Sequence, residues 1–243
     1  MRIQGIIKLY KQGNVSVSGL RGTGKDMLTA NVIARRKMPY ISNMDYKVKR
    51  ALYIPLQMQR LNIENTYKNI VDENIIPYEY PYPENCDIYL SDAGVYFPSQ
   101  YTGQLDKQYS EFPLFQALSR HLGDCNFHFN TQNLGRVWNK IREQSDIYIR
   151  CIWCKVIGKL VFQKVIIYDK YEACESRVKP YKHVQAPIMV SPEARAQYIA
   201  RDEILRREFE ERNGKVKARI LIYRNKSKYD TRYFKKLLGG EKT

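Results

Sequence analysis

Short apolar runs alternate with polar, glycine-containing stretches along the first 150 residues. The runs at residues 3–9, 14–18, 40–43, 87–92 and 126–131 predict five strands. A helix is predicted after Lys25, and it must end before Pro39 because the residue preceding a proline is pushed out of helical geometry. Further helices are predicted at 112–122, where apolar residues fall at helical spacing, and at 137–141. This alternation predicts an α/β fold with a mostly parallel sheet flanked by helices.

Two stretches of this first part carry weaker patterns. Residues 51–56 are apolar and a helix is predicted at 63–71, after which Pro77, Pro81 and Pro83 indicate an extended connector. Residues 93–110 are rich in Gly, Gln and Tyr, and we expect a loop there, over the end of the strand at 87–92. That strand ends in polar residues, and an α/β sheet places its ligand site at the carboxyl ends of its strands.

The pattern changes after Asp146. Apolar runs at 147–157 and 160–168 flank Gly158-Lys159, which predicts a β-hairpin. Ser191-Pro192 is typical of a helix start, and the predicted helix ends near Arg212. A last strand is expected at 216–223 and a basic helix at 228–238. We therefore divide the chain into a domain at 1–176, which includes the hairpin, and a basic, largely helical tail at 177–243.

Candidate chemistry begins where the strand at 14–18 meets the first long helix. Gly19, Gly24 and Lys25 fit the phosphate-binding loop G-x-x-x-x-G-K-[S/T], except that Asp26 stands where Ser or Thr is expected. In such a loop, backbone N–H groups close around a phosphate, the helix presents its positive end, and the lysine adds a point charge. The strand–loop–helix context favours nucleotide binding. The alternative is a chance glycine-rich turn that caps a helix.

The charge of the chain narrows the choice of partner. The formal net charge is +16, and residues 177–243 hold 18 Lys or Arg against 8 Asp or Glu, a surplus of ten positive charges. Such a surplus attracts nucleic acid or an anionic membrane face. The alternative is a solvated tail that only increases solubility.

Several classes of protein are disfavoured. No uninterrupted apolar run approaches the ~20 residues of a membrane helix, and the first residues lack the pattern of a signal peptide. The five cysteines are odd in number and scattered, which does not suggest a disulfide framework. Cys151 and Cys154 have metal-ligand spacing, but residues i and i+3 of a strand face opposite sides, which disfavours zinc. We expect a cytoplasmic protein.

Polar residues at the ends of later elements follow the phosphate loop in a definite order. They are Ser42-Asn43, Ser91-Asp92-Ala93, Arg120-His121 and Gln132-Asn133. This order resembles the ATPase domain of the zonula-occludens-toxin-like proteins and filamentous-phage assembly proteins, which belong with the FtsK–HerA type of DNA-pumping ATPases. The resemblance covers about residues 3–148. It implies a P-loop NTPase fold, ATP and Mg²⁺ as cofactors, and a homo-oligomer such as a hexamer.

The resemblance also implies roles for single residues. The phosphates would be held by Gly19, Gly22, Thr23, Gly24, Lys25 and Asp26. Asp92 falls at the position that polarises the attacking water, Gln132 at the polar sensor on the neighbouring strand end, and Arg120 at the family's Arg-His pair. Which of Arg120, Arg136 and Arg142 would reach a neighbouring subunit as an arginine finger depends on the oligomer. The alternatives are a turn role for Asp92 and a backbone hydrogen bond for Gln132.

Two departures from the family pattern coincide. Asp26 replaces the loop hydroxyl, and Ser91 replaces the metal-holding aspartate of the strand end. We hypothesise that carboxylate and hydroxyl have exchanged places. Asp26 would then be a direct Mg²⁺ ligand at the positive end of a helix, with Ser91 beside it in the metal site.

These observations predict an ATP-binding and ATP-hydrolysing motor that acts on viral or mobile-element DNA in virion assembly or genome packaging. Its partners would be DNA, further copies of the chain and viral assembly proteins. Members of the family typically carry a membrane helix after the ATPase domain, whereas this chain has a hairpin and a basic tail. We therefore expect it in the cytoplasm, of the host cell if it is viral, with membrane association only through partners. Two rivals stay open: a non-hydrolysing nucleotide- or DNA-binding scaffold, and a small-molecule or nucleotide kinase.

Overall fold

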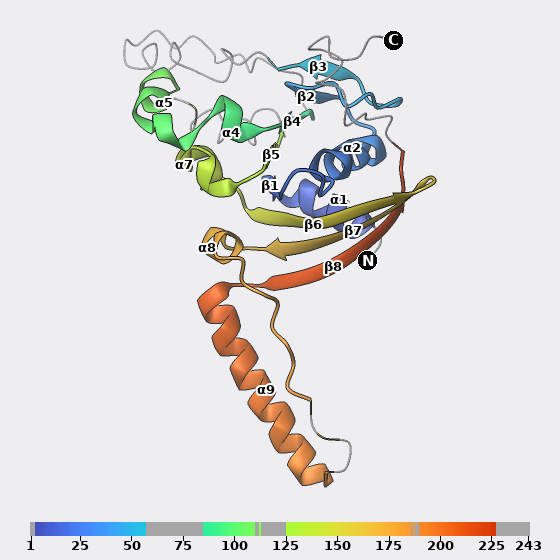
Figure 1. The fold of residues 1–243 in the computed structure, drawn as a ribbon, viewed down its shortest axis with the longest axis vertical. Helices are drawn as coiled ribbons and strands as arrows, with labels where there is room; N and C mark the ends of the chain where they lie inside the picture. The colour runs from blue at the N-terminus through green and yellow to red at the C-terminus, as the bar shows by residue number, and fades with distance from the viewer. Residues whose placement is uncertain are drawn as a thin grey trace.

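One eight-stranded sheet organises the part of the chain that the computed structural model describes, which is residues 3–56, 85–109, 112, 125–185, 187 and 190–226. The strand order is β3-β2-β4-β5-β1-β6-β7-β8 (Figure 1). The strands are β1 Val15–Ser18, β2 Tyr40–Ser42, β3 Tyr53–Pro55, β4 Asp87–Leu90, β5 Phe127–Thr131, β6 Ile147–Ile157, β7 Leu160–Tyr168 and β8 Val216–Arg224. Neighbours from β3 to β6 pair in parallel, whereas β7 pairs antiparallel with both β6 and β8. The predicted mostly parallel α/β sheet is confirmed.

Helices cover both faces of this sheet (Figure 1). They are α1 Gln4–Gln12, α2 Lys25–Arg36, α4 Ala93–Tyr96, α5 Thr102–Gln108, α7 Asn139–Arg142, α8 Tyr171–Glu175 and α9 Pro192–Asn213, with 3₁₀ turns η2 Ser99–Tyr101 and η3 Leu134–Arg136. One core lies under α1 and α2 and contains Tyr10 and Leu28. A second core lies on the other face and contains Phe97, Phe127 and Trp138. Two apolar layers thus fix the sheet between helices.

Two predictions about secondary structure are wrong. Residues 3–9 were expected to form a strand, but they belong largely to helix α1, since Ile3, Ile6, Ile7 and Tyr10 recur at helical spacing and are all buried. The expected loop at 93–110 contains α4, η2 and α5. There Phe97 and Leu105 are buried in the core around Trp138, and this packing supports short helices in spite of the glycines.

Other predictions agree with the structure. Helix α2 ends at Arg36, two residues before the residue that precedes Pro39. The hairpin of β6 and β7 has the predicted bounds, and α9 begins with the Ser191 hydroxyl accepting a hydrogen bond from the Ala194 N–H at 3.3 Å. The short helix predicted at 137–141 begins two residues later, as α7 at Asn139–Arg142, because Val137 follows η3 in extended geometry and Trp138 caps α7. Strand β8, from the segment that we set apart as a tail, joins the common sheet.

Several predictions fall on parts of the chain that the structure does not describe. They are the helix at 63–71, Pro77, Pro81 and Pro83, the helix at 112–122 apart from Phe112, and the basic helix at 228–238. None of the helices that are described is both long and apolar enough to cross a lipid bilayer.

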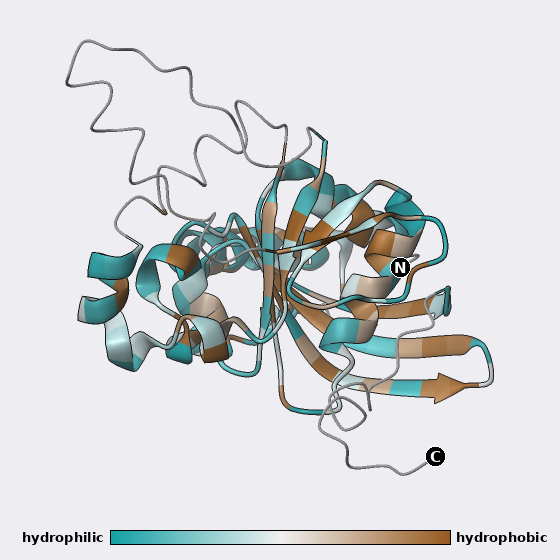
Figure 2. Cartoon of the chain, turned by 90° about the horizontal axis from the view of Figure 1, so that it is seen from above, coloured by the Kyte–Doolittle hydropathy of each residue, from teal (hydrophilic) through white to brown (hydrophobic). Residues whose placement is uncertain are grey.

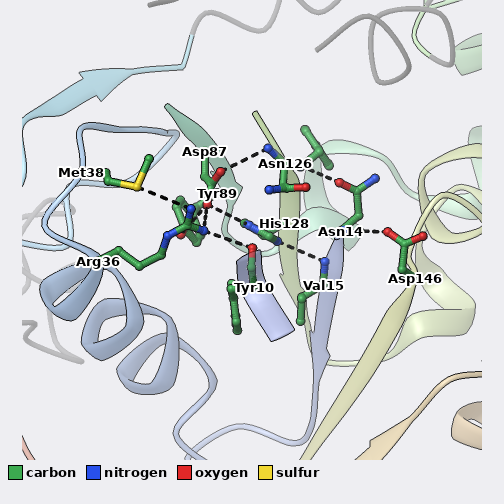
Figure 3. Close-up of polar contacts among 11 residues, drawn as sticks. Tyr10, Asn14, Val15, Arg36, Met38, Asp87, Tyr89, Asn126, His128 and Asp146 are labelled. Carbon is green, nitrogen blue, oxygen red and sulfur yellow. Dashed lines mark hydrogen bonds and ion pairs between the residues drawn. The ribbon is translucent and has the colours of Figure 1, made fainter. Parts of the chain in front are cut away.

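A buried polar network closes the amino end of the sheet (Figure 3). Asp87 forms an ion pair with Arg36 and contacts His128 Nε2 at 3.3 Å. The other ring nitrogen of His128, Nδ1, accepts a hydrogen bond from the Val15 N–H at 3.1 Å, so this nitrogen carries no proton. Asn14 joins the same network, because its Oδ1 accepts from the Phe127 N–H at 2.8 Å. The network therefore ties α2, β4, β5 and β1 together at the end opposite the phosphate loop.

Candidate functional site

The glycines of the phosphate loop stand where larger residues would collide with strand β6. Gly19 has φ +148°, and a Cβ there would lie 2.5 Å from the Cys151 carbonyl oxygen. Gly24 has φ +82°, and its Cβ would lie 2.7 Å from the Cβ of Cys154. Left-handed backbone and close approach both require glycine at these positions. The loop therefore follows β6 closely, and its shape depends on the sequence motif.

Gln163, which is fully buried on β7, holds the phosphate loop through hydrogen bonds to its backbone. Its side-chain amide donates to the carbonyl oxygens of Thr23 and Gly24, at 3.0 Å each, and its Oε1 accepts from the Tyr223 hydroxyl at 2.9 Å. In a trans peptide the C=O and the following N–H point in opposite directions. Because both carbonyls point at Gln163, the N–H groups of Gly24 and Lys25 point toward the opposite side of the loop. That orientation suits an anion.

Lys25 opens helix α2 and folds back over the loop. Its side chain is buried, and its Nζ lies 3.4 Å from the Leu20 carbonyl oxygen. The Thr23 hydroxyl donates to the same oxygen at 2.7 Å. A lysine with such a long contact to a neutral oxygen has a charge that a phosphate could bind more strongly.

Asp26 and Ser91, the two residues that depart from the family pattern, are in contact. The Ser91 hydroxyl, at the end of β4, donates to Asp26 Oδ1 at 3.1 Å. Asn130 Nδ2, on β5, donates to the same oxygen at 3.0 Å. Both donors are neutral and both reach Oδ1, so no cation among the described residues is hydrogen-bonded to this carboxylate.

The side chain of Asn43 holds the backbone of Ser91 in position through two hydrogen bonds. Its Oδ1 accepts from the Ser91 N–H at 2.8 Å, and its Nδ2 donates to the Ser91 carbonyl oxygen at 2.9 Å. In this reciprocal pair the Asn43 side chain, which follows β2, satisfies both the N–H and the carbonyl group of the buried Ser91. The contact between the loop and β4 therefore rests on a rigid strand end.

Asp92 follows directly and turns the chain into α4. It has φ +51° and ψ +49°, a left-handed conformation that is uncommon for a residue other than glycine, and its side chain makes no cap hydrogen bond to α4. Desolvation first, and then the charge of Asp26, raise the pKa of its carboxyl, whereas Lys25 lowers it. Asp92 thus brings a half-buried carboxyl to the end of β4, close enough to Asp26 for the two side chains to interact electrostatically.

A cavity of about 330 Å³ opens in front of Asp92. Its lining includes Leu20 of the loop, Gln132 at the end of β5, and Arg136. A smaller cavity of about 110 Å³ lies on the other side of Leu20 and shares Gln132 with the first. Two of the predicted residues, Asp92 and Gln132, therefore line one cavity at the carboxyl ends of β4 and β5, and the charge of Lys25 acts on Asp92 from nearby.

Not every predicted residue lies there. Arg120 falls outside the described residues. Arg142 stacks its guanidinium 4.2 Å from the ring centre of Tyr171, whereas Arg136 lines the larger cavity. Sequence reasoning missed Gln163 and Asn130 as site residues. The available signal was weak: Asn130 is one of three polar residues in β5, and Gln163 lies next to a second polar residue, Lys164, in β7.

The donor set around Asp26 suits a hard divalent cation. A carboxylate and a hydroxyl are the oxygen ligands that Mg²⁺ takes, and Mg²⁺ usually fills its other positions with water and substrate phosphates. Within the described part of the chain there is no cluster of three or more His, Cys, Asp or Glu that could hold a metal by itself. A site here would therefore depend on a nucleotide to complete it.

The sequence was compared with protein families and with solved structures. No family model matches it, and no curated protein matches it. Solved structures to which the chain is similar include the N-terminal domain of zonular occludens toxin from Neisseria meningitidis, with 11% identity, 68% of this chain and 90% of that chain covered, and a TM-score of 0.37. The genome packaging NTPase B204 of Sulfolobus turreted icosahedral virus 2, in complex with ATP-gammaS, matches with 13% identity, 65% and 93% coverage, and a TM-score of 0.39. With its phosphate loop between β1 and α2 of a parallel sheet, the chain has the fold of a P-loop NTPase.

Proposed function

We propose that this chain binds ATP with Mg²⁺, hydrolyses it, and works as an oligomeric motor on viral or mobile-element DNA during virion assembly or genome packaging. The observation that carries the proposal is the contact between Asp26 and Ser91. It joins the phosphate loop to the end of β4 beside Asp92, at 3.1 Å. The order of motifs along the chain, which resembles that of the phage assembly ATPases, supports the choice of DNA.

Each group would act by position and charge. Lys25 and the N–H groups of Gly24 and Lys25 would hold the β- and γ-phosphates. Asp92, once ionised, would accept a hydrogen bond from the attacking water and orient it, with Gln132 alongside. Mg²⁺, held by Asp26 with Ser91 beside it, would neutralise phosphate charge. Arg136, which lines the cavity in front of Asp92, would stabilise negative charge that develops there.

Hydrolysis is the first thing to test. Purified full-length chain should release phosphate from ATP, faster when double-stranded DNA is added, and Lys25→Ala should abolish release. Lys8→Ala, on the exposed side of α1, is the matched control and should keep the full rate. Tight ATP binding without turnover in the presence of any DNA would refute the motor.

The metal assignment has its own test. Asp26 places a second negative charge at the phosphates, so ATP binding should depend on Mg²⁺ more steeply than in a loop with a hydroxyl there. Asp26→Thr restores the usual residue and should reduce that dependence. ATP titrations by calorimetry, with Mg²⁺ and with EDTA, measure it. Equal affinity in the two conditions for the wild-type chain would dismiss Asp26 as a ligand.

A non-hydrolysing nucleotide- or DNA-binding scaffold is the second candidate. The observation that favours it is the same pair of departures, since the usual strand aspartate of the metal site is here Ser91. This reading predicts ATP affinity without turnover, and normal assembly in Asp92→Asn.

The DNA contact is proposed for the basic segments after Arg177. Because β8 belongs to the sheet, truncation at that point would remove a strand, so charge substitution is the better test. Replacing the exposed Lys179 and Lys182 by alanine should weaken DNA binding and reduce its dependence on salt by about two charges. Unchanged binding would mean that these charges serve solubility.

A further inference from the structure

The smaller cavity, of about 110 Å³, borders the phosphate loop at Ser18 and Gly19 and is lined by two arginines that no step of the proposed function uses. We propose that it is a second phosphate-binding site, in which Arg150 and Arg177 take up the inorganic phosphate that hydrolysis releases. The inference rests on the proposed function, because ATP hydrolysis supplies this phosphate. It adds a place where the product is held after it leaves the phosphate loop.

The cavity is built from elements that are far apart in the sequence. Arg150 lies on β6, paired in register with Ser18 at the end of β1, and Gln132 contributes from the end of β5. Arg177 follows α8 and has φ +57°, a left-handed backbone that is uncommon outside glycine and that occurs preferentially at functional sites. Seen from above, the strands form a central layer with helices on either side (Figure 2). The cavity lies on the side of α8, whose Cys174 lines it.

Neither arginine has an anionic partner in the part of the chain that the structure describes. No hydrogen bond or ion pair joins either guanidinium group to another described residue, although Arg150 is half-buried. Burial raises the pKa of the Cys174 thiol to about 11 and that of the Tyr168 hydroxyl to about 12, and the charge of Arg150 acts against both shifts. The groups that Arg150 faces are therefore neutral at pH 7. A half-buried cation among neutral groups is a favourable partner for an anion that enters.

The lining also contains one carboxylate, Glu175. Burial first, and then a hydrogen bond to Glu175, raise the pKa of the Tyr171 hydroxyl, so this carboxylate already accepts a donor of its own chain. Its Oε1 lies close to Gly135 as well, where a Cβ would be 2.9 Å away. Two guanidinium groups against one carboxylate leave the lining with a surplus of one positive charge.

The size of the cavity favours a small anion. Pockets that hold a whole cofactor or drug-sized ligand typically have about 300–1,000 Å³. The larger cavity, at about 330 Å³, falls in that range, whereas the smaller one has about 110 Å³, the space of roughly three to four water molecules. That space suits one compact tetrahedral anion and is too small for a nucleoside. The planar fork of an arginine matches the oxygens of a phosphate in geometry.

The two cavities adjoin, which gives the phosphate a route between them. Both are lined by Leu20, Gln132 and Asn133. Leu20 is 71% exposed, Gln132 is also exposed, and no hydrogen bond fixes the Gln132 side chain to another described residue. A phosphate released in front of Asp92 would therefore have to pass only these two exposed side chains to reach Arg150.

The test measures phosphate binding while the nucleotide site is filled. The full-length chain, saturated with a non-hydrolysable ATP analogue and Mg²⁺, is titrated with inorganic phosphate by calorimetry, and the wild type should bind one phosphate per chain. Arg150→Gln and Arg177→Gln should each weaken this binding about tenfold or more, as expected when a hydrogen bond between charged groups is lost. Arg177 is exposed, so its variant tests the site even if loss of Arg150 disturbs folding. Arg219→Gln, at an exposed arginine of β8 that lines neither cavity, is the matched control and should bind phosphate like wild type.

The same variants show whether the site is used during turnover. Added phosphate should inhibit ATP hydrolysis by the wild-type chain, and the inhibition constant should rise in Arg150→Gln by the same factor as the dissociation constant for phosphate. Inhibition that is as strong in Arg150→Gln as in wild type would mean that phosphate acts only at the nucleotide site, and would overturn the assignment.

Three further results would overturn it. They are a wild-type chain that binds no phosphate beside the analogue, phosphate binding that both arginine variants leave unchanged, and a loss of ATP affinity in Arg150→Gln as large as the loss of phosphate affinity. If inorganic phosphate does not bind but Arg150→Gln weakens binding of an oligonucleotide, the arginines contact a backbone phosphate of nucleic acid instead. The two proposals fail separately. A chain that hydrolyses ATP but binds no phosphate overturns this site alone, whereas a chain that binds phosphate but never hydrolyses ATP overturns the motor and the origin of the phosphate.

Discussion

The two ends of the sheet use similar residues for opposite purposes. At the amino end, Asp87 is buried against Arg36 and His128, and Asn126 N–H also donates to it at 3.2 Å. At the carboxyl end, the hydrogen-bond donors to Asp26 among the described residues are neutral, Ser91 and Asn130, and the Asp92 carboxyl lies nearby. Asp87 is thus paired with a cation, whereas Asp26 is paired with none in the described part of the chain.

The difference teaches how to separate structural charges from functional ones in this fold. A buried charge with an opposite charge and full hydrogen bonding holds elements together. A charge that is left uncompensated beside a cavity and a loop of N–H groups costs free energy in the absence of a ligand, and a ligand of the right charge recovers it. Substitutions at the two ends should therefore affect different measurements.

The largest effect is expected at the amino end. Asp87→Ala leaves the Arg36 guanidinium buried without its partner, which should lower the free energy of unfolding by about 3–5 kcal/mol. ATP affinity at a temperature where the variant is folded should match wild type. Urea denaturation measures the first quantity and calorimetry the second. Asp106→Ala, which breaks the more exposed ion pair with Lys140, should cost less than about 1 kcal/mol. A large loss of ATP affinity in Asp87→Ala would contradict the assignment of Asp87 to a structural role only.

At the carboxyl end of the sheet, substitutions should reduce ATP affinity and leave the stability of the fold nearly unchanged. Lys25→Ala should weaken ATP binding by about 1.5–3 kcal/mol, the range for a hydrogen bond to a charged group. Its unfolding free energy should change by less than about 1 kcal/mol, because among the described residues Nζ contacts a neutral backbone oxygen at a long distance, 3.4 Å. Thermal denaturation without nucleotide checks this. A strongly destabilised Lys25→Ala would mean that the lysine is a structural residue.

Gln163→Leu should change both the free energy of unfolding and the affinity for ATP. This residue is fully buried, and it also holds the phosphate loop. The substitution removes two bonds to loop carbonyls, which should cost about 1–3 kcal/mol of stability and also weaken ATP binding, because the N–H groups lose their orientation. Gln100→Leu, at an exposed position, is the control. Unchanged ATP affinity in Gln163→Leu would show that the glycines alone shape the loop.

The smallest effect is a dependence on pH at Asp92. Burial raises the pKa of this carboxyl above its ordinary value of 3.8, so the folded state binds the proton more tightly than the unfolded state. Ionisation of Asp92 therefore lowers the free energy of unfolding. This loss is absent below pH 3.8 and grows as the pH rises toward the raised pKa. Asp92→Asn should therefore melt at a higher temperature than wild type at pH 7, and the difference should vanish toward pH 3.8. A difference that does not change with pH would have another cause.

Some parts of the site could be predicted without a structure. The phosphate loop is local, because glycine, lysine and the strand–helix transition lie within a dozen residues. The hairpin and α9 were equally predictable, since Gly158 and the Ser191-Pro192 pair are strong local signals. By contrast, residues 3–9 contain β-branched residues typical of a strand, and only packing against α2 and β1 selects the helical period for them.

The sequence by itself determined the loop, the alternation of strands and helices, and the coincidence of two unusual residues at positions 26 and 91. It could not show that these two residues meet, that Gln163 from 139 residues along the chain orients the loop, or that β8 returns to the sheet after α9. The reason is physical. Hydrogen bonds between distant residues depend on strand order and register, and these are decided by burying two apolar layers on one sheet rather than by any local pattern.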